Sequence, residues 1–140
     1  MALSIYLDAS VLVALLLEDP FSARAEDLLR QEAKMPVVSD FAAAEFASAA
    51  ARRVRTGELK ADAAREAFAD LDGWISGTAQ RFETTSADVS MAAGFVRRLD
   101  LNLRTPDALH IALTLRSGSS LATFDDRLLA SAQALGVPTI

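Results

Sequence analysis

Four acidic residues in this sequence have the type and placement needed to hold a divalent cation: Asp8, Glu45, Asp107 and Asp125. Asp8 closes a short β-prone run and Asp125 follows another. Both are therefore expected at the carboxyl ends of parallel strands, where ligands bind in open α/β sheets. Glu45 and Asp107 lie early in helices that are predicted to begin at the same edge. The set is thus expected to converge on one edge of a sheet.

The chemistry of such a set follows from its charge. Carboxylates brought together repel one another, which raises their pKa values and destabilises the fold. Mg²⁺ or Mn²⁺ removes that cost, because these hard ions prefer oxygen ligands and need neither His nor Cys. A site built only from acids at a sheet edge is what metal-dependent phosphodiester hydrolysis requires.

Each acid also has a purely structural interpretation. Asp8 and Asp125 could cap the helices that follow them, and Asp107 near a helix N-terminus would contribute about 0.3–1 kcal/mol with no further role. Glu45 is harder to explain in this way, since it lies in the apolar stretch FAAAEFASAA. Taken singly, each acid is more often structural, but a set that converges on one edge favours a functional role.

The elements that must position these acids alternate along the chain. Strands are predicted at residues 4–8, 37–39, 81–85, 120–124 and 137–140, and helices at 9–18, 22–34, 39–56, 59–76, 86–100, 105–117 and 125–135. Strands that alternate with one or two helices indicate a parallel sheet covered on both faces. The chain shows no internal repeat and no linker, which indicates one continuous domain.

Composition excludes several other chemistries. The absence of Cys excludes thiolate metal sites and cysteine nucleophiles, and with His110 as the only histidine a Ser/His/Asp triad could be built only around it. A net charge of −5 argues against binding nucleic acid by bulk electrostatics, although 12 of the 14 basic residues are Arg, a bidentate phosphate ligand. The longest aliphatic run, 11–17, is too short to span a bilayer, so a cytoplasmic protein without a membrane segment is expected.

Three stretches of the sequence occur in an order and spacing typical of one family: YLDASVLVALLLEDP, SDFAAAEFASAAARRVRTGEL and LRTPDALHIALTLRSGSSLATFDDRLLASAQALGV. They resemble the PIN-domain ribonucleases and, among these, the VapC-type toxins of bacterial type II toxin–antitoxin pairs. The resemblance covers essentially the whole chain. It implies that residues 1–140 form a single PIN domain, an α/β fold in which a three-layer α/β/α sandwich surrounds a central parallel β-sheet.

The family's four acids fall on the residues already singled out. An LD-x-S strand ending places the first on Asp8, and an E-x-x-x-A helix places the second on Glu45. The DALHIA motif places the third on Asp107, and a T-x-D-x-x-L pattern places the fourth on Asp125. The resemblance implies that all four are catalytic and that Asp8, Asp107 and Asp125 bind Mg²⁺ or Mn²⁺.

Other residues are assigned around this set. Ser10 and Thr123 are similar to the family's small hydroxyl residues that hold the carboxylates or waters of the metal site. Arg104 and Arg52 are candidate contacts to RNA phosphates or to an acidic residue of an antitoxin, with an ordinary solvated helix face as an equal alternative. Asp126 is interpreted as an exposed acid. His110 is expected to be hydrogen-bonded and partly buried rather than a general acid–base.

The resemblance implies an Mg²⁺- or Mn²⁺-dependent endoribonuclease toxin. In the implied mechanism, metal-activated water attacks the RNA phosphorus in line and leaves a 5′-phosphate and a 3′-hydroxyl. A homodimer neutralised by a cognate antitoxin is implied as well.

The sequence leaves three other functions to consider. A catalytically silent, partner-binding protein of the same fold is the main alternative, although all four acid positions are filled. A phosphatase would need a second acid where Ser10 stands, and a DNA-directed nuclease would be expected to carry added DNA-binding elements.

Overall fold

The sheet at the centre of the structure is parallel. In the computed structural model, which describes residues 2–31 and 33–140, its strands are β1 (Ser4–Leu7), β2 (Met35–Ser39), β3 (Gln80–Phe82) and β4 (Ser120–Ala122). Their order is β3-β2-β1-β4, and every neighbouring pair is parallel. From β1 the chain therefore moves to β2 on one side and returns later to β4 on the other. The point at which strand order reverses lies at the carboxyl end of β1, where a ligand site is expected.

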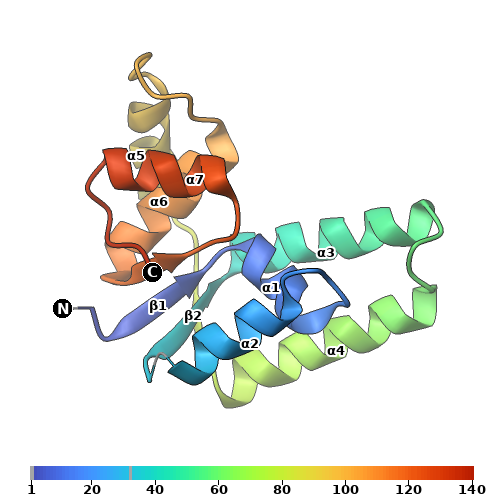
Figure 1. The fold of residues 1–140 in the computed structure, drawn as a ribbon. Helices are drawn as coiled ribbons and strands as arrows, with labels where there is room; N and C mark the ends of the chain where they lie inside the picture. Colours follow the sequence, from blue (N-terminus) through green and yellow to red (C-terminus); the bar gives the residue numbers. More distant parts are fainter. Residues whose placement is uncertain (1, 32) are drawn as a thin grey trace.

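Helices cover both faces of this sheet (Figure 1). Those in the described residues are α1 (Ala9–Leu16), α2 (Ser22–Gln31), α3 (Asp40–Arg55), α4 (Ala61–Gly77), α5 (Ser86–Val96), α6 (Thr105–Ser117) and α7 (Asp126–Ala134). The first four form one layer and the last three form the other (Figure 1). The predicted α/β/α sandwich with a central parallel sheet is confirmed. None of these described helices is long and apolar enough to cross a membrane.

The side chains of each strand alternate between the two faces of the sheet, and this alternation produces two hydrophobic cores. Ile5 and Leu7 of β1 pack with Val38 of β2 into the core beneath α1–α4. Tyr6 and Val37 point to the opposite face and pack beneath α5–α7. Successive side chains of a strand face opposite sides, and both sides are covered here, so these strands read as continuous apolar runs.

The ends of several elements differ from the sequence-based prediction. The predicted strand 137–140 is reduced to a single bridge between Leu121 and Thr139, because Pro138 has no N–H to extend the ladder. Strand β3 ends at Phe82 rather than at residue 85, since Thr85 instead forms a capping box with Asp88 and begins α5. Helices α1 and α5 end at residues 16 and 96, before the predicted 18 and 100. Position 32, inside the predicted helix 22–34, lies outside the described residues.

An ion pair between the exposed Arg116 and the buried Asp88 joins α5 to α6. The Nε and Nη2 atoms of Arg116 donate to the two carboxylate oxygens of Asp88 at 2.7 and 2.9 Å. Burial alone would raise the pKa of Asp88, but the hydrogen bonds from Arg116 and Thr85 outweigh it and hold that pKa below its usual range. This pair fixes α6, the helix that carries Asp107 and His110, against its neighbour.

Candidate active site at the sheet edge

The four predicted acids line one cavity at the carboxyl edge of the sheet. Asp8 enters it from the β1–α1 junction, Glu45 from α3, Asp107 from α6, and Asp125 from the β4–α7 junction. The cavity has a volume of about 140 Å³ and is also lined by Ser10 and by other residues: Ala9, Pro106, His110 and Leu128. Four segments that are far apart in the sequence thus meet at the point where strand order reverses.

Asp8 is the most buried of the four acids, with 4% of its surface exposed. Its Oδ1 accepts hydrogen bonds from Ser10 Oγ at 2.6 Å and from Val11 N at 3.2 Å, and its Oδ2 accepts from Thr123 Oγ1 at 2.5 Å. Burial raises the pKa of Asp8 even though these hydrogen bonds oppose the shift. The residue is both the N-cap of α1 and a carboxylate whose charge is incompletely compensated.

Ser10 and Thr123 lie where the resemblance implied, around Asp8. Ser10 Oγ also accepts from Phe124 N at 2.9 Å, and Thr123 Oγ1 accepts from Asp125 N at 3.0 Å. The two hydroxyl groups therefore connect the end of β1 to the segment that follows β4. They set the distance between the first and the fourth acid.

Asp125 and Asp107 both line the cavity. Asp125 is the N-cap of α7, and its Oδ1 accepts from Arg127 N and Leu128 N. Asp107 is half-buried in the first turn of α6. Burial raises the pKa of Asp107, and the charge of Asp125 raises it further. Repulsion between carboxylates, predicted for this set, is thus present between these two.

Glu45 is paired with His110. The Nε2 atom of His110 lies 2.5 Å from Glu45 Oε1, and its Nδ1 atom lies 2.7 Å from the Tyr6 hydroxyl. His110 is 3% exposed, so the expectation of a hydrogen-bonded histidine is confirmed and its burial is greater than expected. The contact with Glu45 was not predicted, since the spacing of three residues placed His110 near Asp107. No local signal reveals a contact across 65 positions of the sequence.

The remaining predicted residues lie outside the acid cavity. Arg52, on α3, lines two hollows that adjoin it. Arg104 is the exposed N-cap residue of α6 and does not contact the cavity among the described residues. Asp126 is the exposed first residue of α7 and is likewise outside it, as its interpretation required.

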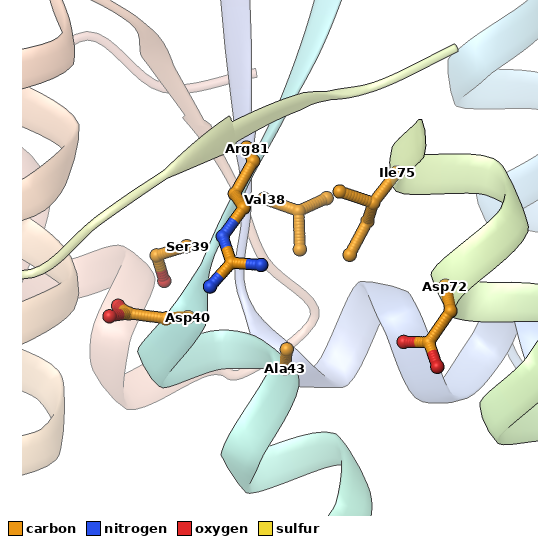
Figure 2. A pocket seen from close by; sticks show the side chains of 7 residues that line it. All are labelled: Val38, Ser39, Asp40, Ala43, Asp72, Ile75 and Arg81. Carbon is orange, nitrogen blue, oxygen red and sulfur yellow. The ribbon is translucent and has the colours of Figure 1, made fainter. Parts of the chain in front are cut away.

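A separate hollow of about 210 Å³ lies between α3, α4 and β3. Figure 2 shows the Arg81 side chain reaching into it between Asp40 and Asp72, above Ala43. Asp40 is already engaged by Thr84, whose backbone N and Oγ1 both donate to its Oδ1. A guanidinium between two carboxylates leaves no excess positive charge to attract an anion. The uncompensated acids lie in the other cavity.

The donor set of the acid cavity suits a hard divalent cation. Its four acids offer only oxygen ligands, which Mg²⁺ and Mn²⁺ prefer, and the imidazole of His110 is turned toward Glu45. In residues 2–31 and 33–140, no three acidic or imidazole side chains are arranged closely enough to hold a metal ion as they stand. Binding would require Asp107 and Asp125 to turn toward one another and toward Asp8, against the burial and the charge of Asp125 that together raise the pKa of Asp107.

Comparison with known proteins gives a consistent result. Residues 5–134 match the PIN domain family. The chain is 33% identical over 141 residues to Ribonuclease VapC46 of Mycobacterium tuberculosis, and the alignment covers 98% of this chain and 96% of that protein. The crystal structure of Mycobacterium tuberculosis VapC20, a sarcin-ricin loop cleaving toxin, matches with a TM-score of 0.76 at 20% identity, over 97% of this chain and 98% of that one. VapBC2 from Rickettsia felis, bound to a DNA fragment from their promoter, matches with a TM-score of 0.66 at 13% identity, over 91% and 92%.

Proposed function

Because this chain belongs to the PIN domain family and resembles its VapC-type members over nearly its whole length, we propose that it is an endoribonuclease toxin. The reaction is the hydrolysis of RNA phosphodiester bonds. The single observation that carries the proposal is the meeting of Asp8, Glu45, Asp107 and Asp125 around one cavity. The name of the 33% identical relative, a ribonuclease, supports RNA as the substrate.

Asp8, Asp107 and Asp125 are the residues that would hold Mg²⁺ or Mn²⁺. When bound, such an ion lowers the pKa of water and neutralises charge on the phosphate and the leaving oxygen. Asp8 is held rigidly by its three hydrogen bonds, so its orientation is set before any ligand arrives. Glu45, the fourth acid, lines the same cavity and would accept a proton from the attacking water.

The substrate path is proposed to run along α3 from the acid cavity. One adjoining hollow, of about 370 Å³, is lined by Glu45, Ser48, Ala49, Arg52 and Arg55, and the next, of about 410 Å³, continues past Arg52 and Arg53. Arg53 is held by Asp19 at 3.1 Å. Arg52 and Arg55 have no ion-pair partner in the described part of the chain. Their guanidinium groups are therefore available to RNA phosphates in a protein whose net charge is −5.

We expect Arg52→Gln to weaken RNA binding at all sequences and to reduce the dependence of affinity on salt. Loss of one phosphate contact lowers the slope of log K against log salt by about 0.7 on single strands. Fluorescence anisotropy with a labelled RNA, from 50 to about 200 mM salt, measures both effects. Arg65→Gln is the matched control, since it removes the same charge from the exposed face of α4, where Arg65 pairs with Asp62. If the two variants behave alike, net charge rather than this path governs binding.

A cognate antitoxin is the proposed protein partner, supported by the match to VapBC2. The contact of Arg104 with RNA or antitoxin, and the homodimer, stay predictions. A variant of Arg52 that loses antitoxin binding while keeping RNA affinity would assign that residue to the partner instead.

The proposed function is tested by incubating the purified protein, free of antitoxin, with total bacterial RNA. Discrete fragments that carry 5′-phosphates are expected with Mg²⁺ or Mn²⁺, and no cleavage is expected with EDTA. Cleavage that persists in EDTA would contradict the proposed chemistry. Tight Mn²⁺ binding without cleavage would support the proposed metal site but contradict RNA as the substrate. Absence of both would favour the catalytically silent, partner-binding alternative.

A further inference from the structure

We propose that Ser39, Tyr6 and His110 form a positioning frame that fixes Glu45 in the acid cavity, an inference that rests on the proposed nuclease function. The three residues are joined by consecutive hydrogen bonds. Tyr6 Oη lies 2.8 Å from Ser39 Oγ and 2.7 Å from His110 Nδ1, and His110 Nε2 lies 2.5 Å from Glu45 Oε1. His110 therefore acts through Glu45 and does not itself reach the reacting groups.

Each member of the frame lies within six residues of one acid of the site, on the same element or the one directly before it. Tyr6 lies on β1 two residues before Asp8, and Ser39 is the N-cap of α3, six residues before Glu45. His110 lies on α6 three residues after Asp107, one helical turn away. The chain of hydrogen bonds thus connects the three elements that carry Asp8, Glu45 and Asp107. It fixes their relative positions from beneath the cavity.

The frame is enclosed. Tyr6 and Ser39 are completely buried and His110 is 3% exposed. The imidazole also lies against two aromatic rings, with ring centroids 5.0 Å from that of Phe41 and 5.7 Å from that of Tyr6. Side chains held by both packing and hydrogen bonds have little freedom to reorient, which is what a supporting group around a catalytic carboxylate requires.

The hydrogen bonds have one consistent direction for a neutral imidazole. Glu45 is a carboxylate with acceptor oxygens only, so His110 Nε2 must carry the proton and donate it. Nδ1 is then an acceptor, and Tyr6 Oη donates to it. Ser39 Oγ accepts from Ala42 N at 2.9 Å, which leaves its own hydrogen for Tyr6 Oη. In this arrangement every polar side-chain atom of the frame has a hydrogen-bond partner. Among the described residues, no buried side-chain nitrogen or oxygen lacks one.

The functional consequence lies in which oxygen of Glu45 is free. His110 occupies Oε1, which leaves Oε2 as the oxygen available to incoming ligands. Without the donor at Nε2, the Glu45 side chain could rotate about its own bonds or turn away from the cavity. Loss of an outer partner of this kind lowers activity by about 10–100-fold in metal sites.

The frame can be observed directly, because His110 is the only histidine of the chain. In the ¹⁵N-labelled full-length protein, imidazole NMR is expected to show one pair of resonances with the proton on Nε2. Tyr6→Phe removes the donor to Nδ1 and the acceptor of the Ser39 hydroxyl, so the Nδ1 resonance is expected to shift while the proton stays on Nε2, which still donates to Glu45. A wild-type spectrum with the proton on Nδ1, or with no preferred form, would overturn the frame.

Two substitutions of His110 separate positioning from packing. His110→Gln keeps an N–H donor near the position of Nε2, whereas His110→Leu keeps bulk and removes the donor. Gln is expected to stay within about 3-fold of the wild-type kcat, and Leu to lower kcat by about 10–100-fold with little change in KM. Ser119→Ala is the matched control for stability, since it removes a buried hydroxyl bonded to Ser4 Oγ at the opposite edge of the sheet.

The outcomes distinguish failure of the positioning frame from failure of the proposed nuclease function. If the wild type cleaves RNA and His110→Leu cleaves equally fast, the frame is rejected and the nuclease stands. If the wild type does not cleave RNA, the proposed function fails, while the imidazole spectra still support or reject the frame.

Discussion

Replacement of Asp8 by Asn is expected to reduce RNA cleavage by about 10²–10³-fold, a loss of the size seen when one electrostatic group of an active site is removed. The substitution keeps the shape of the side chain and its ability to accept hydrogen bonds from Ser10 and Val11. Burial raises the pKa of the Asp8 carboxyl, which means that its ionised form destabilises the fold. Asn carries no charge, so the variant is expected to be at least as stable as the wild type. Single-turnover cleavage rates and melting temperatures, measured on the same preparations, test both statements.

Asp126→Asn is the matched control for this prediction. It makes the same change of charge next to Asp125, but at an exposed position outside the acid cavity. We expect it to cleave RNA at the wild-type rate. Equal loss in the two variants would show that net charge, and not position in the cavity, determines the rate, while full activity of Asp8→Asn would remove Asp8 from the chemistry.

A large effect on stability is expected from Mn²⁺ or Mg²⁺, and we expect Asp107→Asn to remove most of it. An ion that binds only the folded state stabilises it by about 2.7 kcal/mol at a concentration 100 times its Kd. In this protein the gain is expected to come from compensating the charge of Asp107, which burial and the charge of Asp125 both destabilise. Calorimetric melting of the wild type and the variant, with Mn²⁺ and with EDTA, measures the difference.

Burial of Asp107, together with the charge of Asp125, predicts a dependence of stability on pH in EDTA. The pKa of Asp107 is higher in the folded protein than its ordinary value of 3.8, so the ionised form destabilises the fold. The destabilisation is complete above the folded pKa, declines as the pH falls through that value, and is absent below 3.8. Asp107→Asn is therefore expected to be more stable than the wild type at pH 7, and this advantage should shrink toward pH 4. A constant difference across this range would contradict the raised pKa of Asp107, and an equal gain from Mn²⁺ in both proteins would contradict its role in binding the ion.

Local patterns were sufficient to predict the fold class. The runs around Ile5, Val38 and Leu121 are short, apolar and followed by helical periodicity, and only a parallel sheet covered on both faces buries such runs. The predicted helix starts at residues 9 and 22 are also those of the structure, whereas Ser86 and Thr105, predicted as caps, are each the first helical residue after the N-caps Thr85 and Arg104. Helix starts carry local signals in their caps and first turns, so they need no knowledge of distant neighbours.

The ends of elements were predicted less well, because they depend on competing partners. Thr85 could extend β3, but its hydroxyl and backbone satisfy a capping box with Asp88, and Arg116 of α6 completes that arrangement. The segment after Gly136 has the composition of a strand, yet Pro138 limits its pairing with Leu121 to one bridge. In both cases a side chain removes the backbone group that would have continued the ladder.

The sequence by itself determined that acids would stand at the ends of β1 and β4 and at the starts of α3 and α6, because strand ends and helix starts are local features. Only the tertiary structure decided how those acids are held. Glu45 lies on a helix of one layer and His110 on a helix of the other, and their contact depends on how both helices are rotated against the sheet. Packing of each helix layer against its own face of the sheet sets that rotation, and no pattern confined to one segment encodes it.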